Sequence, residues 1–207
     1  MPRLKIRGER PVYKEVVIGT AKPVDERPLR ADAKRNRERV LQAAKEAFAA
    51  YGADVPLDTI AASAGVGAGT VHRHFSTKEA LITAVVADRL DGLADRAERC
   101  AASDDPGETF YAFVADLTLE AAHNLVLTSA LGGAALGDDG ARAGARLSTA
   151  LGELLERGKA SGEVRADLTV ADLHALLAGV IEAQRRLPSD RAGFALEIAV
   201  DGLRPRP

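Results

Sequence analysis

A short segment around residue 65 constrains the fold more than any other feature of this 207-residue chain. Two short helical stretches meet there. Ala61 is small enough to let two helices cross closely, and Gly65 can adopt the left-handed conformation that turns the chain sharply. Val71 then returns an apolar side chain to a core shared with Ile60 and Val66. This spacing predicts a helix-turn-helix, although alanine-rich helical proteins also produce it by chance.

Helical periodicity extends over most of the remaining chain, and we expect an all-α fold of about nine helices. Ala and Leu dominate the apolar residues, whereas aromatic residues make up 4% and Trp is absent, which disfavours strands. The run Gly137–Gly140 is expected to be a loop, and Ser76 or Thr77 is expected to cap the fourth helix. The expected helices span about residues 31–51, 56–64, 68–75, 77–102, 108–127, a segment to 136, 141–160, 168–187 and 189–203.

The charges divide the chain into a basic front and an acidic rear. Residues 1–78 hold 15 Lys and Arg against 9 Asp and Glu, a net of +6. Residues 79–207 hold 13 against 21, a net of −8. This division fits a nucleic-acid-binding domain over 31–78 joined to a separate helical domain over 79–207, or else it is an accidental charge gradient. The basic arm over 1–30 is either a DNA-contacting segment or a plain tail.

Four short motifs follow a basic amphipathic helix. They are Ile60-Ala61, Ala64-Gly65-Val66, Gly69-Thr70-Val71-His72-Arg73-His74-Phe75 and Lys78-Glu79-Ala80-Leu81. Together they cover about residues 33–82 and resemble the TetR family of bacterial repressors. The resemblance implies an N-terminal three-helix head with a helix-turn-helix, a fourth helix linking it to a C-terminal ligand-binding and dimerisation domain, and a homodimer on operator DNA.

The third helix of such a head enters the major groove with its N-terminal residues nearest the bases. Gly67, Ala68 and Gly69 have little or no side chain and would permit close backbone approach. Thr70 can hydrogen-bond a phosphate or contact a thymine methyl group. Arg73 is the candidate for a bidentate contact to guanine, with a phosphate contact as the alternative.

Five further residues are candidates for contacts around the groove. Lys78 resembles the family's phosphate-clamping lysine at the start of the fourth helix. Lys34 and Arg35 could reach phosphates from the first helix, or they could form an ordinary solvated face. His72 stands where the family usually has tyrosine, and because histidine changes charge at roughly pH 6–7, binding could depend on pH. His74 either packs beside Phe75 or contacts a phosphate.

The rear half matches the family in length and helix count only, so its sites are weaker expectations. An unknown small-molecule effector would bind between the fourth helix and its neighbours. Its candidate lining residues are Phe110, Phe113, Val114, Leu117, His123 and Leu131. The last two helices would form the dimer interface, with intrachain core as the alternative reading of the same residues. Those residues are Leu173, Leu176, Leu177, Val180, Ile181, Phe194, Leu196, Ile198, Ala199 and Leu203.

Other functional classes fit the sequence poorly. The glycines between 65 and 69 lack the preceding strand of a nucleotide-binding loop, and the third of them is not at the position that such a loop requires. The His residues and the single Cys100 have no metal-site spacing, no cofactor is expected, and no catalytic arrangement is recognised. With no signal peptide or membrane span, we expect a cytoplasmic protein. The rivals are a small-molecule carrier or enzyme with a vestigial head, and a non-sensing architectural DNA binder.

Overall fold

The computed structural model describes residues 26–123, 137–188, 191 and 193–205, and every regular element among them is a helix. The expected all-α fold is therefore confirmed. The described helices are α1 (Glu26–Tyr51), α2 (Leu57–Ala64), α3 (Ala68–His74), α4 (Lys78–Ala101), α5 (Pro106–His123), α7 (Gly137–Ala160), α8 (Val170–Arg186) and α9 (Phe194–Leu203).

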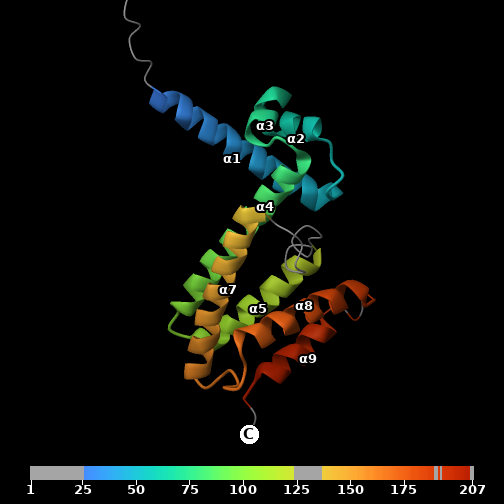
Figure 1. The fold of residues 1–207 in the computed structure, drawn as a ribbon. Coiled ribbons are helices and arrows are strands. Elements are labelled where there is room, and N and C mark those ends of the chain that lie inside the picture. Colours follow the sequence, from blue (N-terminus) through green and yellow to red (C-terminus); the bar gives the residue numbers. More distant parts are fainter. Residues whose placement is uncertain (1–25, 124–136, 189–190, 192, 206–207) are drawn as a thin grey trace, which may run out of the picture.

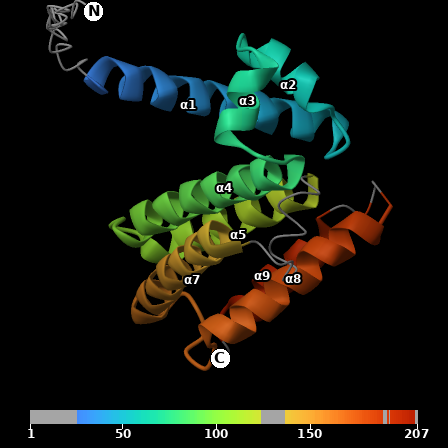
Figure 2. The ribbon, with the colours of Figure 1, turned by 45° about the horizontal axis from the view of Figure 1, so that its top comes forward.

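Two groups of helices lie at opposite ends of the molecule. Figures 1 and 2 show α1, α2 and α3 gathered at one end and α5, α7, α8 and α9 at the other. We call the first group the head and the second the body. Helix α4 runs from the head into the body alongside α7, with which it makes its most extensive contact.

Each end has its own apolar core, and α4 contributes to both. Leu81 and Val85, near the start of α4, pack into the head core with residues of α1, α2 and α3. Leu90 and Leu93, farther along the helix, belong to the body core with residues of α5, α7 and α8. A rigid helix shared by two cores provides a direct mechanical connection between them.

Charged side chains add to the packing of α4. Arg146 of α7 donates to Asp95 at 2.6 Å and to Glu98 at 2.8 Å, and these hydrogen bonds raise its pKa, with Asp95 as the largest cause. Lys45 of α1 forms an ion pair with Asp88 on α4. The ion pairs therefore connect α4 to the head on one side and to α7 on the other.

Three helix starts differ from the prediction by four or more residues, and one of them is α9, which begins at Phe194 and not near 189. Helix α1 begins at Glu26, earlier than the expected residue 31. The expected loop Gly137–Gly140 is wrong, because these residues form the first turn of α7. Asp138 and Asp139 lie in that turn, where negative charge favours the partial positive charge of the helix N-terminus. The predicted segment to residue 136 and most of the arm over 1–30 lie outside the described residues.

Candidate nucleic-acid interface

The turn between α2 and α3 has the geometry that the sequence predicted. Gly65 has φ 62° and ψ 38°, in the left-handed region, and the backbone N–H of Val66 donates to Ala61 at 3.0 Å. Arg39 of α1 donates its Nη2 to the Gly65 carbonyl oxygen at 3.0 Å. A Cβ atom at position 65 would lie 2.6 Å from that nitrogen. Glycine is therefore the one residue that fits here without a shift of the Arg39 side chain.

A compact apolar core fixes α2 and α3 against α1 and α4. Ile60 and Ala61 of α2 are buried, as is Val71 of α3, and all three belong to the head core. Phe75, which follows α3 directly, is also buried there. The structural roles predicted for Ala61, Gly65 and Val71 are therefore confirmed by their burial and backbone geometry, with Val66 half-buried beside them.

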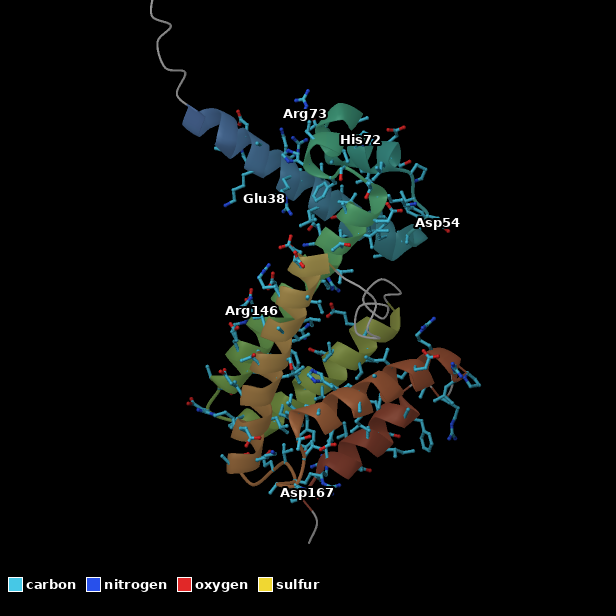
Figure 3. All side chains as sticks on the ribbon, in the orientation of Figure 1. Glu38, Asp54, His72, Arg73, Arg146 and Asp167 are labelled. Carbon is cyan, nitrogen blue, oxygen red and sulfur yellow. The ribbon has the colours of Figure 1, made fainter. Side chains whose placement is uncertain are left out.

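The outer face of α3 is open to solvent. The exposed residues there are Gly67, Ala68, Gly69, His72 and Arg73, and Thr70 is half-buried. Figure 3 shows the Arg73 and His72 side chains on the head, at the end of the molecule away from α8 and α9. Within the described residues, no carboxylate forms an ion pair with Arg73. An unpaired guanidinium on an exposed helix is available to a base edge or a phosphate.

His74 lies on the other side of α3 and is half-buried. Its ring centroid is 6.5 Å from that of Phe75, with the two ring planes tilted by 56°. This geometry favours the packing alternative for His74 over a phosphate contact. The phosphate contact stays a prediction.

The cations around α3 have different surroundings. Lys34 lies 3.9 Å from Glu38, and Arg35 pairs with Asp32, both within α1 and both exposed. These partners favour the reading of an ordinary solvated face. Lys78 is the first residue of α4. The residue before it, Thr77, caps the helix, because its hydroxyl accepts a hydrogen bond from the Ala80 N–H at 3.1 Å. The predicted cap at Ser76 or Thr77 is therefore confirmed.

Sequence reasoning missed two arginines of α1 that support α3 and the turn before it. Arg39 holds the turn, as described above, and the Arg37 guanidinium lies 5.2 Å from the centroid of the Phe75 ring. Both contacts join residues far apart in the chain. Helical periodicity alone carries no signal for them, because it places these side chains on a polar face.

The predicted effector residues fall into several environments. Phe110, Val114 and Leu117 are buried in the body core, and so is Phe113. His123 ends α5, but nothing is described of its side chain, and Leu131 lies outside the described residues. The four described side chains of the predicted set thus lie on the apolar face of α5, and the effector site stays a prediction.

A partly enclosed cavity lies between α5, α7 and α8, with a volume of about 110 Å³. We call it the body cavity. Burial lowers the pKa of His174, the one ionisable side chain in its lining. The lining residues are Leu117, Leu147, Leu151, His174, Leu177, Ala178 and Ile181.

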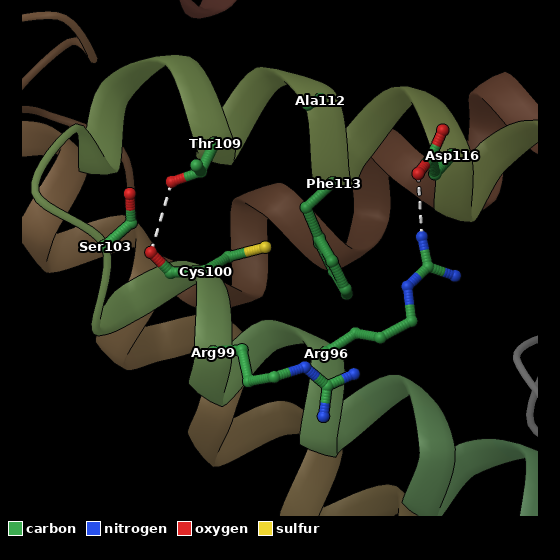
Figure 4. A pocket seen from close by; sticks show the side chains of 8 residues that line it. All are labelled: Arg96, Arg99, Cys100, Ser103, Thr109, Ala112, Phe113 and Asp116. Carbon is green, nitrogen blue, oxygen red and sulfur yellow. Dashed lines mark hydrogen bonds and ion pairs between the residues drawn. The ribbon is translucent and has the colours of Figure 1, made fainter.

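A more open pocket lies on the surface between α4 and α5 (Figure 4). Cys100 is half-buried there, and its backbone carbonyl accepts from the Thr109 hydroxyl at 3.1 Å. Arg96 crosses the pocket to donate to Asp116 at 2.8 Å and lies over the Phe113 ring. These contacts among the lining residues occupy most of its polar groups.

The residues predicted for the dimer interface divide into two sets. Leu173, Leu177, Val180 and Ile181 of α8 are buried within the chain, and so are Ala199 and Leu203 of α9. Their burial leaves little surface for a second copy. By contrast, Phe194 and Ile198 of α9 are 41% and 59% exposed, while Leu176 of α8 and Leu196 of α9 are half-buried.

Two other kinds of site are absent from the part of the chain that the structure describes. No described helix is both long enough and apolar enough to cross a membrane. No group of three or more His, Cys, Asp or Glu side chains among the described residues is arranged to hold a metal ion.

Comparison with known proteins agrees with this architecture. Residues 40–85 match the family described as bacterial regulatory proteins, tetR family, and residues 105–205 match the SbtR-like transcriptional regulator C-terminal domain. A TetR transcription regulatory protein from Mycobacterium vanbaalenii is 45% identical, and the match covers 86% of this chain and 99% of that one with a TM-score of 0.65. The chain belongs to the TetR family.

Two further TetR-type proteins extend the comparison. The TetR regulator SCO0520 from Streptomyces coelicolor is 34% identical, with 83% of this chain and 99% of that chain covered and a TM-score of 0.65. The curated relative TtgW of Pseudomonas putida, an uncharacterized HTH-type transcriptional regulator, is 45% identical over 64 residues. That match spans 30% of this TetR-family chain and 48% of the relative. The TetR family is a family of regulators and not of enzymes.

Proposed function

We propose that this TetR-family chain is a repressor that binds a palindromic operator as a homodimer and releases it when a small molecule binds. In this proposal residues 31–78 read DNA, residues 79–207 bind the effector and the second copy, and residues 1–30 are a basic arm. The observation that carries the proposal is the exposed outer face of α3 above a fixed turn, with Arg73 free of any described acidic partner.

Operator recognition would use the two ends of that face. The small residues Gly67, Ala68 and Gly69 let the α3 backbone approach the bases, and Arg73 reaches a guanine or a phosphate. Lys78 would hold a phosphate from the start of α4. The exposed His72 would donate to a backbone phosphate in place of the usual tyrosine, and Thr70 would contact a phosphate or a thymine methyl group.

The test is a gel-shift titration of the purified protein on DNA from the region upstream of its own gene, against scrambled DNA at stated salt. If Arg73 reads guanine, Arg73→Ala costs about 1–3 kcal/mol of binding free energy per half-site and relaxes the sequence preference. Lys78→Ala instead lowers affinity for all sequences and reduces the slope of log affinity against log salt concentration by about one. The matched control is Arg99→Ala, which removes an exposed arginine in the last turn of α4, away from the head. Equal binding to both DNAs would refute operator recognition.

A second copy would dock on the exposed face of α9. Phe194 and Ile198 present apolar surface there, which is what a homodimer buries. Such a dimer would carry two α3 helices about one DNA turn, ~34 Å, apart. Light scattering tests this directly: Ile198→Glu should give a monomer, whereas Tyr51→Glu, a control at an exposed apolar residue of the head, should not.

Effector binding would act through α4. The body cavity is lined partly by α7, and α7 is joined to α4 by packing and by the Arg146 ion pairs. A ligand that favours one arrangement of α7 against α4 would therefore shift the heads of a dimer relative to each other. Linkage requires ligand and operator to weaken each other's binding by the same factor. In this proposal the protein has no enzymatic activity and acts in the cytoplasm, where the operator is.

A further inference from the structure

The body cavity is more enclosed than the pocket between α4 and α5, and its lining is specific enough to indicate what it accepts. We propose that the effector is a small uncharged molecule of about the size of phenol, with one hydrogen-bonding group directed at His174. The proposal rests on the proposed function, because it names the class of molecule that the same regulatory site binds.

Volume sets the size of the occupant. The body cavity measures about 110 Å³. For comparison, an engineered apolar cavity of ~150 Å³ in another protein stays dry and binds benzene. The body cavity thus has room for one six-membered ring after small side-chain adjustments at its opening. A fused pair of rings or a long acyl chain would require the body core to separate, because packed interiors deform little.

The lining sets the polarity of the occupant. Six of its seven residues are Leu, Ile or Ala, and none is Asp, Glu, Lys or Arg. A charged ligand would lose its hydration without gaining an opposite charge, which is unfavourable in an apolar site. An uncharged ring loses little on entering, because apolar surface gains from leaving water.

His174 provides the one polar contact. Burial lowers its pKa, so the imidazole is neutral at neutral pH and offers one donor and one acceptor. Within the part of the chain that the structure describes, His174 has no hydrogen-bond partner. A hydroxyl group on the ligand would satisfy it, since a hydroxyl both donates and accepts.

The position of the cavity connects this ligand to the head. Leu147 and Leu151 line it from α7, one turn apart, and Arg146 on the same helix binds Asp95 and Glu98 of α4. A ring bound between α7 and α8 would favour one arrangement of α7 against α4. Leu81, near the start of α4, packs into the head core and so connects that arrangement to the head.

The experiment is calorimetric titration of the whole chain with five probes: phenol, toluene, benzoate, benzylamine and 1-naphthol. Phenol should bind, while benzoate and benzylamine, which carry a charge on the same ring, should bind more than about tenfold more weakly. Naphthol, with two fused rings, should not bind. Tighter binding of a charged or two-ring probe than of phenol, or no binding of any probe, would overturn the proposal.

Three variants locate the site. His174→Phe should remove the preference for phenol over toluene, and His174→Asn should restore part of it. Leu151→Phe should fill the cavity and abolish phenol binding, whereas Ala145→Phe on the exposed face of α7 should leave it unchanged. Circular dichroism identifies any variant that fails to fold. Phenol binding unaffected by both His174 variants would place the ligand elsewhere and refute the assignment.

Operator binding, measured on the same samples without probe, separates this proposal from the proposed function. Intact operator binding with tight binding of benzoate would refute the effector class and leave the regulator standing. Phenol binding that meets the predictions in a protein that ignores operator DNA would support the class of ligand and refute the regulatory role.

Discussion

Replacing Gly65 with alanine tests the structural basis of the turn between α2 and α3. Gly65 has a left-handed backbone, in which an L-residue costs about 1–2 kcal/mol. Its new Cβ would lie 2.6 Å from Nη2 of Arg39, the atom that donates to the Gly65 carbonyl. Because the arginine end is flexible, it would swing away and lose that exposed hydrogen bond, which contributes roughly 1 kcal/mol. We expect Gly65→Ala to lower the free energy of unfolding by about 2–3 kcal/mol.

Urea unfolding followed by circular dichroism measures this change as a fall in the midpoint at constant slope. Gly67→Ala is the matched control, because Gly67 has φ −72° and a Cβ added there would meet no atom within 4 Å. That variant should stay within about 0.5 kcal/mol of the parent or gain slightly. Equal stability of the two variants would refute the argument from backbone strain.

A double-mutant cycle divides the effect between strain and contact. In an Arg39→Ala background the hydrogen bond is already absent, so Gly65→Ala should cost only the left-handed strain of about 1–2 kcal/mol. A full cost of about 3 kcal/mol in that background would mean that Arg39 does not share the penalty.

Three further results are expected. Gly69→Ala should hold or raise stability by up to about 1 kcal/mol, because no atom lies within 4 Å of the added methyl group. If α3 enters the groove as proposed, the same methyl group would weaken operator binding in a gel shift. Thr169→Ala removes the capping box of α8, so the free energy of unfolding should fall by about 1 kcal/mol. The Thr169 hydrogen bonds lower the pKa of Asp172, so NMR titration of this variant should find that pKa nearer its usual value. Burial lowers the pKa of His174 from 6.5, so at acidic pH the unfolded chain binds more protons than the folded chain. The contribution of neutral His174 to stability is therefore complete above pH 6.5 and is lost as the pH falls. His174→Gln should have a flatter pH profile of urea midpoints.

The head could be predicted from the sequence because its geometry depends on local requirements. A left-handed turn needs glycine, and two helices that cross closely need a small residue, so Gly65 and Ala61 indicate the motif without knowledge of the partners. The same reasoning explains what it missed. Arg39 lies in α1, distant in the chain from the turn that it holds, and no periodicity links the two.

The body was harder to predict because its residues satisfy two descriptions equally well. The apolar stripe of α8 fits either an intrachain core or a dimer interface, and only the packing shows that Leu173 and Ile181 face the core of their own chain. The glycine and aspartate run at 137–140 is typical of a loop, yet acidic residues at a helix N-terminus also stabilise a first turn. Composition alone does not decide between these outcomes.

Helix α4 explains how one chain can couple two such different parts. Its first turns belong to the head core and its later turns to the body core, so a displacement at one end is carried along a continuous hydrogen-bonded helix. Lys45 and Arg146 bind carboxylates of α4 from opposite partners, α1 and α7. Exposed ion pairs contribute little each, and they weaken in salt. The apolar contacts of Leu81 and Leu90 must therefore hold the two ends. In the proposed mechanism, the Arg146 ion pairs would only adjust the balance between arrangements of α7 against α4 that an effector would shift.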